Sequence, residues 1–154
     1  MTAREAIGDL LVDYGLLIDE DRLEDWLGLF AEECVYTVIT RENLDQGLPQ
    51  PLILCENKRM LRDRIGAYRE VNEYNLHLDR HVIGAPRFVE AAAARWRIQA
   101  GYGLFQTDLE GTSRLFLVGA YDMIGRFDEE KPLLTDVTVI VDTASIPTLL
   151  ATPV

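Results

Sequence analysis

The spacing of apolar residues changes midway along the chain, and this change most restricts the possible fold. Between residues 94 and 104 the even positions are small or apolar, whereas Arg95 and Arg97 occupy odd positions. Strict alternation of this kind predicts a long β-strand with one buried face. Residues 114–127 and 133–142 are also rich in β-branched and aromatic residues, and turn-forming residues separate the three segments. They predict two further long strands.

Four glycines lie inside the expected strands, at positions 101, 103, 119 and 125. Glycine within a strand often marks a bend or a bulge. Long strands that bend repeatedly and follow one another through turns predict a strongly curved antiparallel sheet.

The first half of the chain has helical spacing instead. Thr2 and Glu5 form a capping box, and apolar residues then recur at i, i+3, i+4 and i+7. Asp21 with Glu24 repeats the start signal before a short second helix with one apolar face. A third helix is expected over residues 57–71.

Between the second and third helices, residues 34–40 predict a strand and residues 41–51 a loop, because glycine and proline interrupt the second stretch. Helices followed by long bent strands are typical of an α+β domain. We therefore expect one domain over residues 1–154, in which the helices cover the concave face of the curved sheet.

The composition of the chain limits the kinds of molecule that the protein is expected to bind. The chain has 154 residues, a formal net charge of −11 and two cysteines, Cys34 and Cys55. The acidic balance would repel a nucleic-acid backbone, and no apolar run reaches the ~20 residues that cross a bilayer. Two cysteines allow one disulfide at most, and no secretory leader is recognisable. A cytoplasmic protein without nucleic-acid or membrane partners is expected.

Both histidines lie in the segment YNLHLDRHVIGAP, residues 74–86, with Asp79 between them. In a strand, His77 and His81 would stand roughly 13 Å apart, too far for one metal ion to bind both. In a helix they would stack, but Asp79 would point to another side of the axis. An irregular loop could bring all three together, so an iron site of two histidines and one carboxylate stays open. The simpler interpretation is that the imidazoles hydrogen-bond a sheet edge or a subunit surface.

A cone of this kind can enclose a pocket, where a buried carboxylate and a tyrosine could transfer protons beside a carbonyl group. The candidates for such an acid-base pocket are Asp13, Tyr14, Asp19, Tyr36 and His81. Structural roles are the alternative. Tyr14 fits the apolar stripe of the first helix, Asp13 fits its solvent-exposed face, and Asp19 fits its end.

Four segments carry a resemblance to a known family. They are LEDWLGLFAEECVYTV, RENLDQGLP, MLRDRIGAYREVNEYNLHLDRHVIGAPRF and VDTASIPTLLATPV. In this order and at these separations they resemble the small (beta) subunit of aromatic-ring-hydroxylating dioxygenases, over nearly the whole chain. The resemblance implies the nuclear-transport-factor-2-like (cystatin-like) cone fold, in agreement with the α+β interpretation.

The resemblance also implies that catalysis belongs to another chain. In this family the large (alpha) subunit carries the Rieske iron-sulfur cluster and a mononuclear iron, and electrons arrive from NADH through a reductase. The small subunit is mainly structural, without a cofactor of its own, commonly in a complex of three large and three small chains. A free-standing dehydratase or isomerase of the same fold, or a ligand-binding module, is the alternative.

At the residue level, Arg80 and His81 match the family's Arg-His pair that opens a strand. Gly84 and Ala85 stand where members of the family often have Ser-Asn. This departure places the sequence nearer the branch whose large subunits act on aromatic carboxylates such as terephthalate.

The candidate subunit-interface residues come from three places: the histidine segment, a basic stripe on the third expected helix, and the apolar ending SIPTLLATPV. They are His77, Asp79, Arg80, His81, Lys58, Arg62, Arg69, Ile146, Leu149 and Leu150. Prolines in the ending discourage a regular helix. We expect the ending to lie extended against the curved sheet or against a neighbouring small subunit, because a free apolar tail would be exposed.

Overall fold

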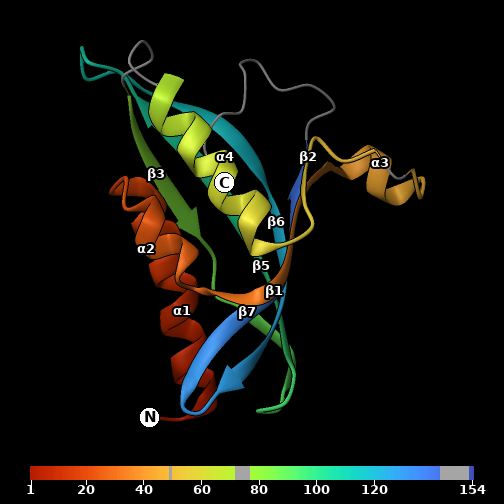
Figure 1. The fold of residues 1–154 in the computed structure, drawn as a ribbon. Helices are drawn as coiled ribbons and strands as arrows, with labels where there is room; N and C mark the ends of the chain where they lie inside the picture. Colours follow the sequence, from red (N-terminus) through yellow and green to blue (C-terminus); the bar gives the residue numbers. More distant parts are fainter. Residues whose placement is uncertain (49, 72–76, 143–152) are drawn as a thin grey trace.

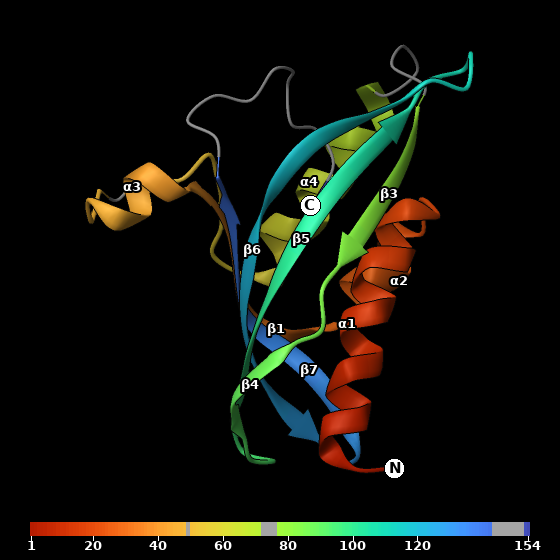
Figure 2. The same ribbon diagram turned by 180° about the vertical axis from the view of Figure 1, so that it is seen from behind.

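The computed structural model describes residues 1–48, 50–71, 77–142 and 153–154. In chain order, its elements are α1 (Ala3–Asp19), α2 (Leu23–Leu27), β1 (Phe30–Thr40), α3 (Arg41–Asp45), β2 (Ile53–Cys55), α4 (Lys58–Val71), β3 (Leu78–Ile83), β4 (Arg87–Ala91), β5 (Trp96–Thr107), β6 (Ser113–Asp128) and β7 (Lys131–Val141). Helices α1, α2 and α4 lie on one side of a curved sheet, and α3 projects away near β1 and β2 (Figure 1, Figure 2). The α+β cone expected from the sequence is confirmed.

The sheet is mixed. Its strand order is β2-β1-β7-β6-β5-β3, and β4 also pairs with β5. Most neighbours are antiparallel, but β1 and β7 run parallel, from Phe30 opposite Leu134 to Thr40 opposite Val141. The expectation of a wholly antiparallel sheet is therefore wrong for this pair. A tight hairpin forces two strands to be antiparallel, whereas β1 and β7 are joined through all the elements between them.

Helix α1 begins as the capping box predicts. The hydroxyl of Thr2 accepts the Glu5 N–H at 3.2 Å, and the Glu5 carboxylate accepts the Thr2 N–H at 2.6 Å. One face of the helix is buried, including Ile7, Leu11 and Tyr14. The apolar spacing and the cap together set both the start of α1 and the side that it turns to the sheet.

The start of α2 differs from the prediction. Asp21 does not cap this helix, which begins at Leu23 after Arg22, and Arg22 makes no side-chain capping bond. Asp21 instead takes a φ of 59° just after α1, a left-handed conformation that aspartate tolerates. Its carboxylate binds Arg69 of α4. The local sequence pattern predicted that this side chain caps a helix, but it makes a contact with a residue distant in sequence instead.

The stretch predicted as a loop over residues 41–51 contains α3. Thr40 caps this helix by accepting the N–H of Asn43 at 3.2 Å. Strands β2 and β4 were also not expected, because runs of three and five residues are too short for alternation to be recognised. None of these three elements changes the layering of the fold.

Two strand glycines are required by close packing between neighbouring strands. A Cβ atom on Gly119 would overlap the carbonyl group of Ile140, and one on Gly125 would overlap the carbonyl oxygen of Leu133 and the ring of Trp96. The ladder between β6 and β7 also shifts register at Gly125. These glycines allow β6 to curve tightly against its neighbours, as the sequence predicted.

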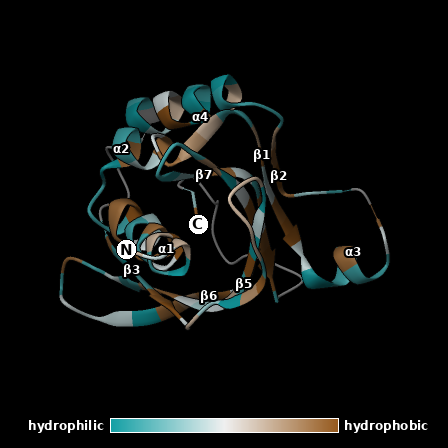
Figure 3. Ribbon diagram, turned by 90° about the horizontal axis from the view of Figure 1, so that it is seen from below, coloured by the Kyte–Doolittle hydropathy of each residue, from teal (hydrophilic) through white to brown (hydrophobic). Residues whose placement is uncertain are grey.

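The core lies between the concave side of the sheet and helices α1, α2 and α4 (Figure 3). Its largest fully buried side chains are Trp26, Trp96, Tyr14, Tyr36, Tyr121 and Phe30. No helix within the described residues is long and apolar enough to cross a membrane.

Candidate functional site

A buried carboxylate-imidazole pair joins the end of α1 to β3. Asp19 Oδ1 lies 2.5 Å from His81 Nδ1, and Asp19 Oδ2 accepts the backbone N–H of His81 at 2.8 Å. The two side chains are 1% and 0% exposed. Both oxygens of Asp19 thus contact His81, which holds the imidazole in one orientation, and Oδ2 also lies 3.9 Å from Nη1 of Arg80.

The close approach of α1 to β3 depends on Gly15. A Cβ atom at this position would stand 3.0 Å from Ile83 Cδ1 and 3.3 Å from His81 Cβ. Contacts this short are tighter than ordinary van der Waals packing, so a larger residue would push the helix away from the strand. Gly15 therefore sets the separation at which Asp19 reaches His81.

A second polar group lies beside this pair. Asp79 faces the same side of β3, and its Oδ1 lies 3.2 Å from His77 Nε2, which in turn contacts the side-chain amide of Gln106 at 3.2 Å. Burial raises the pKa of Asp79 above its usual value, against the opposing charges of His77 and His81. Within this segment β3 spans Leu78–Ile83, and the two histidines contact different carboxylates, His77 that of Asp79 and His81 that of Asp19.

The tyrosines of the predicted acid-base pocket surround a piece of the chain itself. The hydroxyls of Tyr14 and Tyr36 donate to the Val154 carbonyl oxygen at 2.6 and 3.1 Å, and the Val154 N–H donates to the Tyr36 hydroxyl at 3.0 Å. Val154 is fully buried. Burial raises the pKa of both tyrosines well above the usual value, so both are neutral donors.

The five predicted acid-base residues are thus placed in three locations. Tyr14 and Tyr36 hold Val154, and Asp19 and His81 hold each other. Asp13 is exposed and lines a hollow of about 430 Å³ at the outer side of α1, beside the turn between β6 and β7. The pairing of Asp19 with His81 could not be read from the sequence, because the two residues are 62 positions apart.

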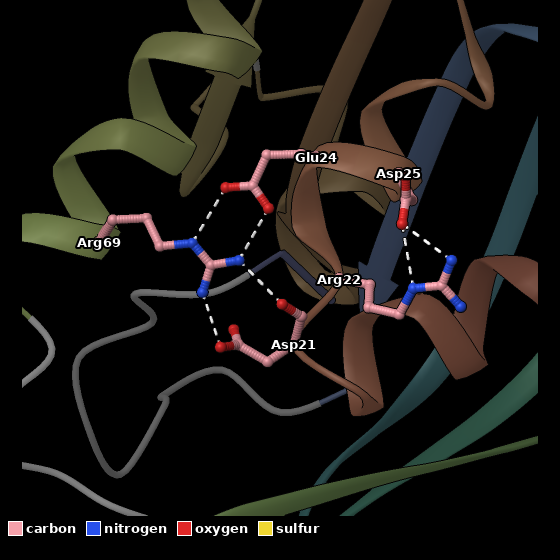
Figure 4. A network of polar contacts seen from close by, with 5 residues as sticks. All are labelled: Asp21, Arg22, Glu24, Asp25 and Arg69. Atoms are coloured by element: carbon pink, nitrogen blue, oxygen red, sulfur yellow. Dashed lines mark hydrogen bonds and ion pairs between the residues drawn. The ribbon is translucent and has the colours of Figure 1, made fainter.

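Two of the three basic interface candidates have partners inside the chain. Arg69 donates to both carboxylate oxygens of Glu24, at 3.1 and 2.9 Å, and to the carboxylate and carbonyl of Asp21, at 2.6 and 2.8 Å (Figure 4). Lys58 donates to the Phe30 carbonyl at 3.0 Å. Arg62 is exposed and has no hydrogen bond or ion pair to the described residues.

In the histidine segment, alternation along β3 separates two faces. His81 and Asp79 point inward, whereas the side chain of Arg80 is 65% exposed on the outer face. Ile146, Leu149 and Leu150 lie outside the described residues. Arg62 and Arg80 are therefore the exposed basic candidates, and of the two only Arg80 has an ion pair among the described residues, with Asp19 at 3.9 Å.

Exposed apolar side chains gather around Arg80 on the outer face of the sheet. They are Leu78 and Val82 of β3, Phe105 of β5 and Leu115 of β6, exposed by 69, 58, 38 and 54%. The register places Arg80 opposite Phe105, and Phe105 opposite Leu115, so these side chains share one face. We call these four residues the outer apolar strip. The sequence signal that could have indicated part of this strip is the pair Leu78 and Val82, which lie two residues before and after Arg80 and so share its face of a strand.

Neither histidines nor cysteines assemble a metal centre in the part of the chain that the structure describes, where no group of three His, Cys, Asp or Glu side chains is placed to hold an ion. Cys34 and Cys55 lie on neighbouring strands as free, buried thiols. Burial raises the pKa of Cys34 to about 11 and also raises that of Cys55.

Comparison with known proteins gives a consistent set of relatives. Residues 1–129 match the model of the SnoaL-like domain family. The anthranilate 1,2-dioxygenase small subunit of Burkholderia cepacia is 36% identical, covering 89% of this chain and 85% of its own. The beta 2 subunit of the terminal oxygenase component of terephthalate 1,2-dioxygenase from Comamonas is 30% identical, covering 91% of both chains.

Solved structures agree with the sequence relatives. A protein from Novosphingobium aromaticivorans, described as the beta subunit of an aromatic-ring-hydroxylating dioxygenase, superposes with a TM-score of 0.89 at 39% identity, covering 99% of this chain and 97% of that one. The beta subunit of benzoate 1,2-dioxygenase from Burkholderia mallei shares the fold, with a TM-score of 0.73 at 16% identity over 88% of each chain.

Proposed function

Because this chain belongs to the family of small (beta) subunits of aromatic-ring-hydroxylating dioxygenases, we propose that it is a non-catalytic structural subunit that supports an iron-bearing large subunit. The complex would act on an aromatic carboxylate, since anthranilate and terephthalate, in the names of its relatives, are both of this class. We further propose three large and three small chains, with electrons supplied by a reductase, in the cytoplasm.

The described residues of this chain do not fit an iron ion of their own. Both oxygens of Asp19 and Nδ1 of His81 are used in the contact between them, and His77 faces a different carboxylate. A mononuclear iron of the facial-triad type needs two histidines and a carboxylate converging on open coordination positions. The Rieske cluster and the mononuclear iron are accordingly assigned to the large subunit.

The observation that carries the proposal is the outer apolar strip. Soluble monomers rarely expose contiguous apolar surface without a function, and such patches mark sites of protein association. Arg80 lies among these side chains and is 65% exposed, although its Nη1 also lies 3.9 Å from Asp19 Oδ2, so its charge is shared between the chain and the surface. The alternative, an acid-base enzyme, would need its tyrosines accessible to substrate, yet Tyr14 and Tyr36 are buried against Val154.

The test is assembly with the large subunit. We predict that Val82→Glu, which places a charge in the outer apolar strip, lowers the recovery of the complex at least tenfold, measured by co-purification and light scattering. The control is Val12→Glu, at a valine of similar exposure on the outer side of α1 (56% against 58%). Circular dichroism checks that both variants fold, and normal assembly of the Val82 variant would remove the strip from the interface.

The same preparations separate the structural role from the enzymatic alternative. The isolated chain, supplied with reductase and NADH, is expected to leave terephthalate and anthranilate unchanged, and addition of the large subunit restores dihydroxylation. Turnover by the small chain alone that survives metal chelation would favour the acid-base enzyme instead.

A further inference from the structure

Val154 is held in the interior of the cone in the way that a protein holds a ligand. Its carbonyl oxygen accepts two hydroxyl donors and its N–H donates to one of the same hydroxyls, so a single residue takes part in three specific hydrogen bonds. The two tyrosines come from different elements, Tyr14 from α1 and Tyr36 from β1. Figure 3 shows this end of the chain between the helices and the sheet.

The two tyrosines that bind this residue belong to a cluster of aromatic rings. Tyr14 meets the rings of Trp26 and Tyr121 edge-on, with centroids 5.6 and 5.3 Å apart, and Tyr36 meets Trp26 at 5.8 Å. Small-molecule sites have this composition: mostly apolar and aromatic walls with a few well-placed polar groups. Here the polar groups are neutral hydroxyls, which suit a carbonyl oxygen rather than a cation.

One further hydroxyl belongs to the same cluster of rings. Tyr121 stacks on Tyr102 with centroids 4.4 Å apart, and its hydroxyl is buried without a hydrogen-bond partner among the described residues. A buried hydroxyl that lacks a partner is costly. The interior therefore offers one more hydrogen-bonding group than Val154 uses.

We propose that the interior of the cone is a binding site for a small molecule that combines a branched apolar group with a carbonyl oxygen, and that Pro153–Val154 is its resident occupant. The proposal does not depend on the assembly proposed above. Pro153 and Val154 are both buried, and Val154 belongs to the hydrophobic core. If these two residues are absent, Tyr14 and Tyr36 lose the groups that they bind, and a molecule of the same chemistry would replace them.

Covalent attachment explains why a free ligand would not compete in the full chain. An occupant joined to the protein acts at an effective concentration that reaches the millimolar range for short connections. A free molecule with the same contacts is displaced unless its concentration exceeds that value. The site should open to added ligand only when the resident residues are removed or expelled.

The probe is N-acetyl-prolyl-valine amide, which carries the side chains and carbonyl groups of the resident occupant. It is added to the full chain, to a chain ending at residue 152, and to the variant Val154→Asp, in which a charged side chain replaces the buried isopropyl group. We expect the probe to raise the melting temperature of the two altered chains by about 3–6 °C at ten times its dissociation constant, and to leave the full chain unchanged.

Tyrosine substitutions in the chain ending at residue 152 test whether the probe uses the same hydroxyls. Tyr36→Phe is expected to weaken probe binding about tenfold, because this hydroxyl both donates to and accepts from Val154. The matched control Tyr121→Phe removes a hydroxyl without a described partner and should leave binding of this probe within twofold. The melting temperature can be measured even if the altered chains are less stable than the full chain. If the probe raises it in neither altered chain, the proposal is wrong. Equal binding by the full chain overturns it as well.

Discussion

At the scale of single residues, the contact between Asp19 and His81 joins two ionisable side chains that are enclosed in the fold. Both side chains are almost fully buried, and both carboxylate oxygens are occupied. Removing one partner of such a pair leaves the other without its hydrogen bond in a site that water does not reach. Each partner is therefore expected to contribute more to the stability of the fold than its place in the secondary structure suggests.

Asp19→Ala is expected to lower the free energy of unfolding by about 3–5 kcal/mol, measured by urea denaturation. The same change at Asp13, which is exposed on the same helix, should stay within about 0.5 kcal/mol. A loss at Asp19 no greater than that at Asp13 would mean that the pair does not join α1 to β3.

Sequence reasoning selected Asp19, His81, Tyr14 and Tyr36 because of their residue types, but it could not group them. Tyr14 and Tyr36 share a partner 140 and 118 positions away, and that partner is a backbone carbonyl with no pattern of its own. Residue type predicts which chemistry is available. The fold alone decides which groups meet.

At the scale of elements, Arg69 connects α4 to the segment that joins α1 and α2. Its guanidinium binds the carboxylate of Glu24 with two nitrogens and also the side chain and carbonyl of Asp21 (Figure 4). The hydrogen bonds from Arg69 hold the pKa of Glu24 below its usual value. A planar guanidinium matches this arrangement, whereas a lysine would supply a single point of charge.

Arg69→Lys should lower stability by about 0.5–1 kcal/mol at low salt, because the pairs are exposed and Lys cannot form the two-point contact. The difference is expected to shrink as salt is raised, since exposed pairs are screened. Arg62→Lys, on the same helix and without a described partner, is the control and should show neither effect. Equal losses at both positions would argue against the connection.

Periodicity predicted the long elements well, and of the short ones it predicted α2 but not α3, β2 or β4. Helices α1 and α4 and strands β1, β5, β6 and β7 were expected because each displays several repeats of its own period. Strands β2 and β4 and helix α3 are too short to do so. The parallel pairing of β1 with β7 was missed for another reason. Alternation of apolar and polar residues shows which face of a strand is buried, but it does not show which strand lies beside it or in which direction that strand runs.

At the scale of the whole molecule, the buried tyrosines and cysteines make the fold sensitive to alkaline pH. Burial raises the pKa of Tyr14, Tyr36, Tyr102 and Tyr121, and that of Cys34 to about 11. In the unfolded chain these groups release their protons near pH 8.5 for cysteine and about 10 for tyrosine. The folded chain binds more protons in that range, so its stability is full below pH 8 and falls as pH rises.

We predict that the free energy of unfolding is constant within about 1 kcal/mol between pH 6.5 and 8, and decreases steeply between roughly pH 9 and 11. Each group with a raised pKa contributes a slope of up to about 1.4 kcal/mol per pH unit. Urea titrations at constant ionic strength measure the change, and tyrosinate absorbance should appear together with the loss of circular dichroism. Tyrosinate absorbance for all the buried rings while the fold persists would contradict the prediction.

The parallel contact between β1 and β7 also determines when the protein can be completed during its synthesis. Thr40 pairs with Val141, roughly a hundred residues later in the chain, so β1 has no partner on that side until β7 has left the ribosome. During that interval β2, α4 and β3 can already contact β1, α2 and α1, but the edge of β1 that β7 occupies stays open. The nascent chain is then most exposed to aggregation, and completion of β7 is the event that ends this risk.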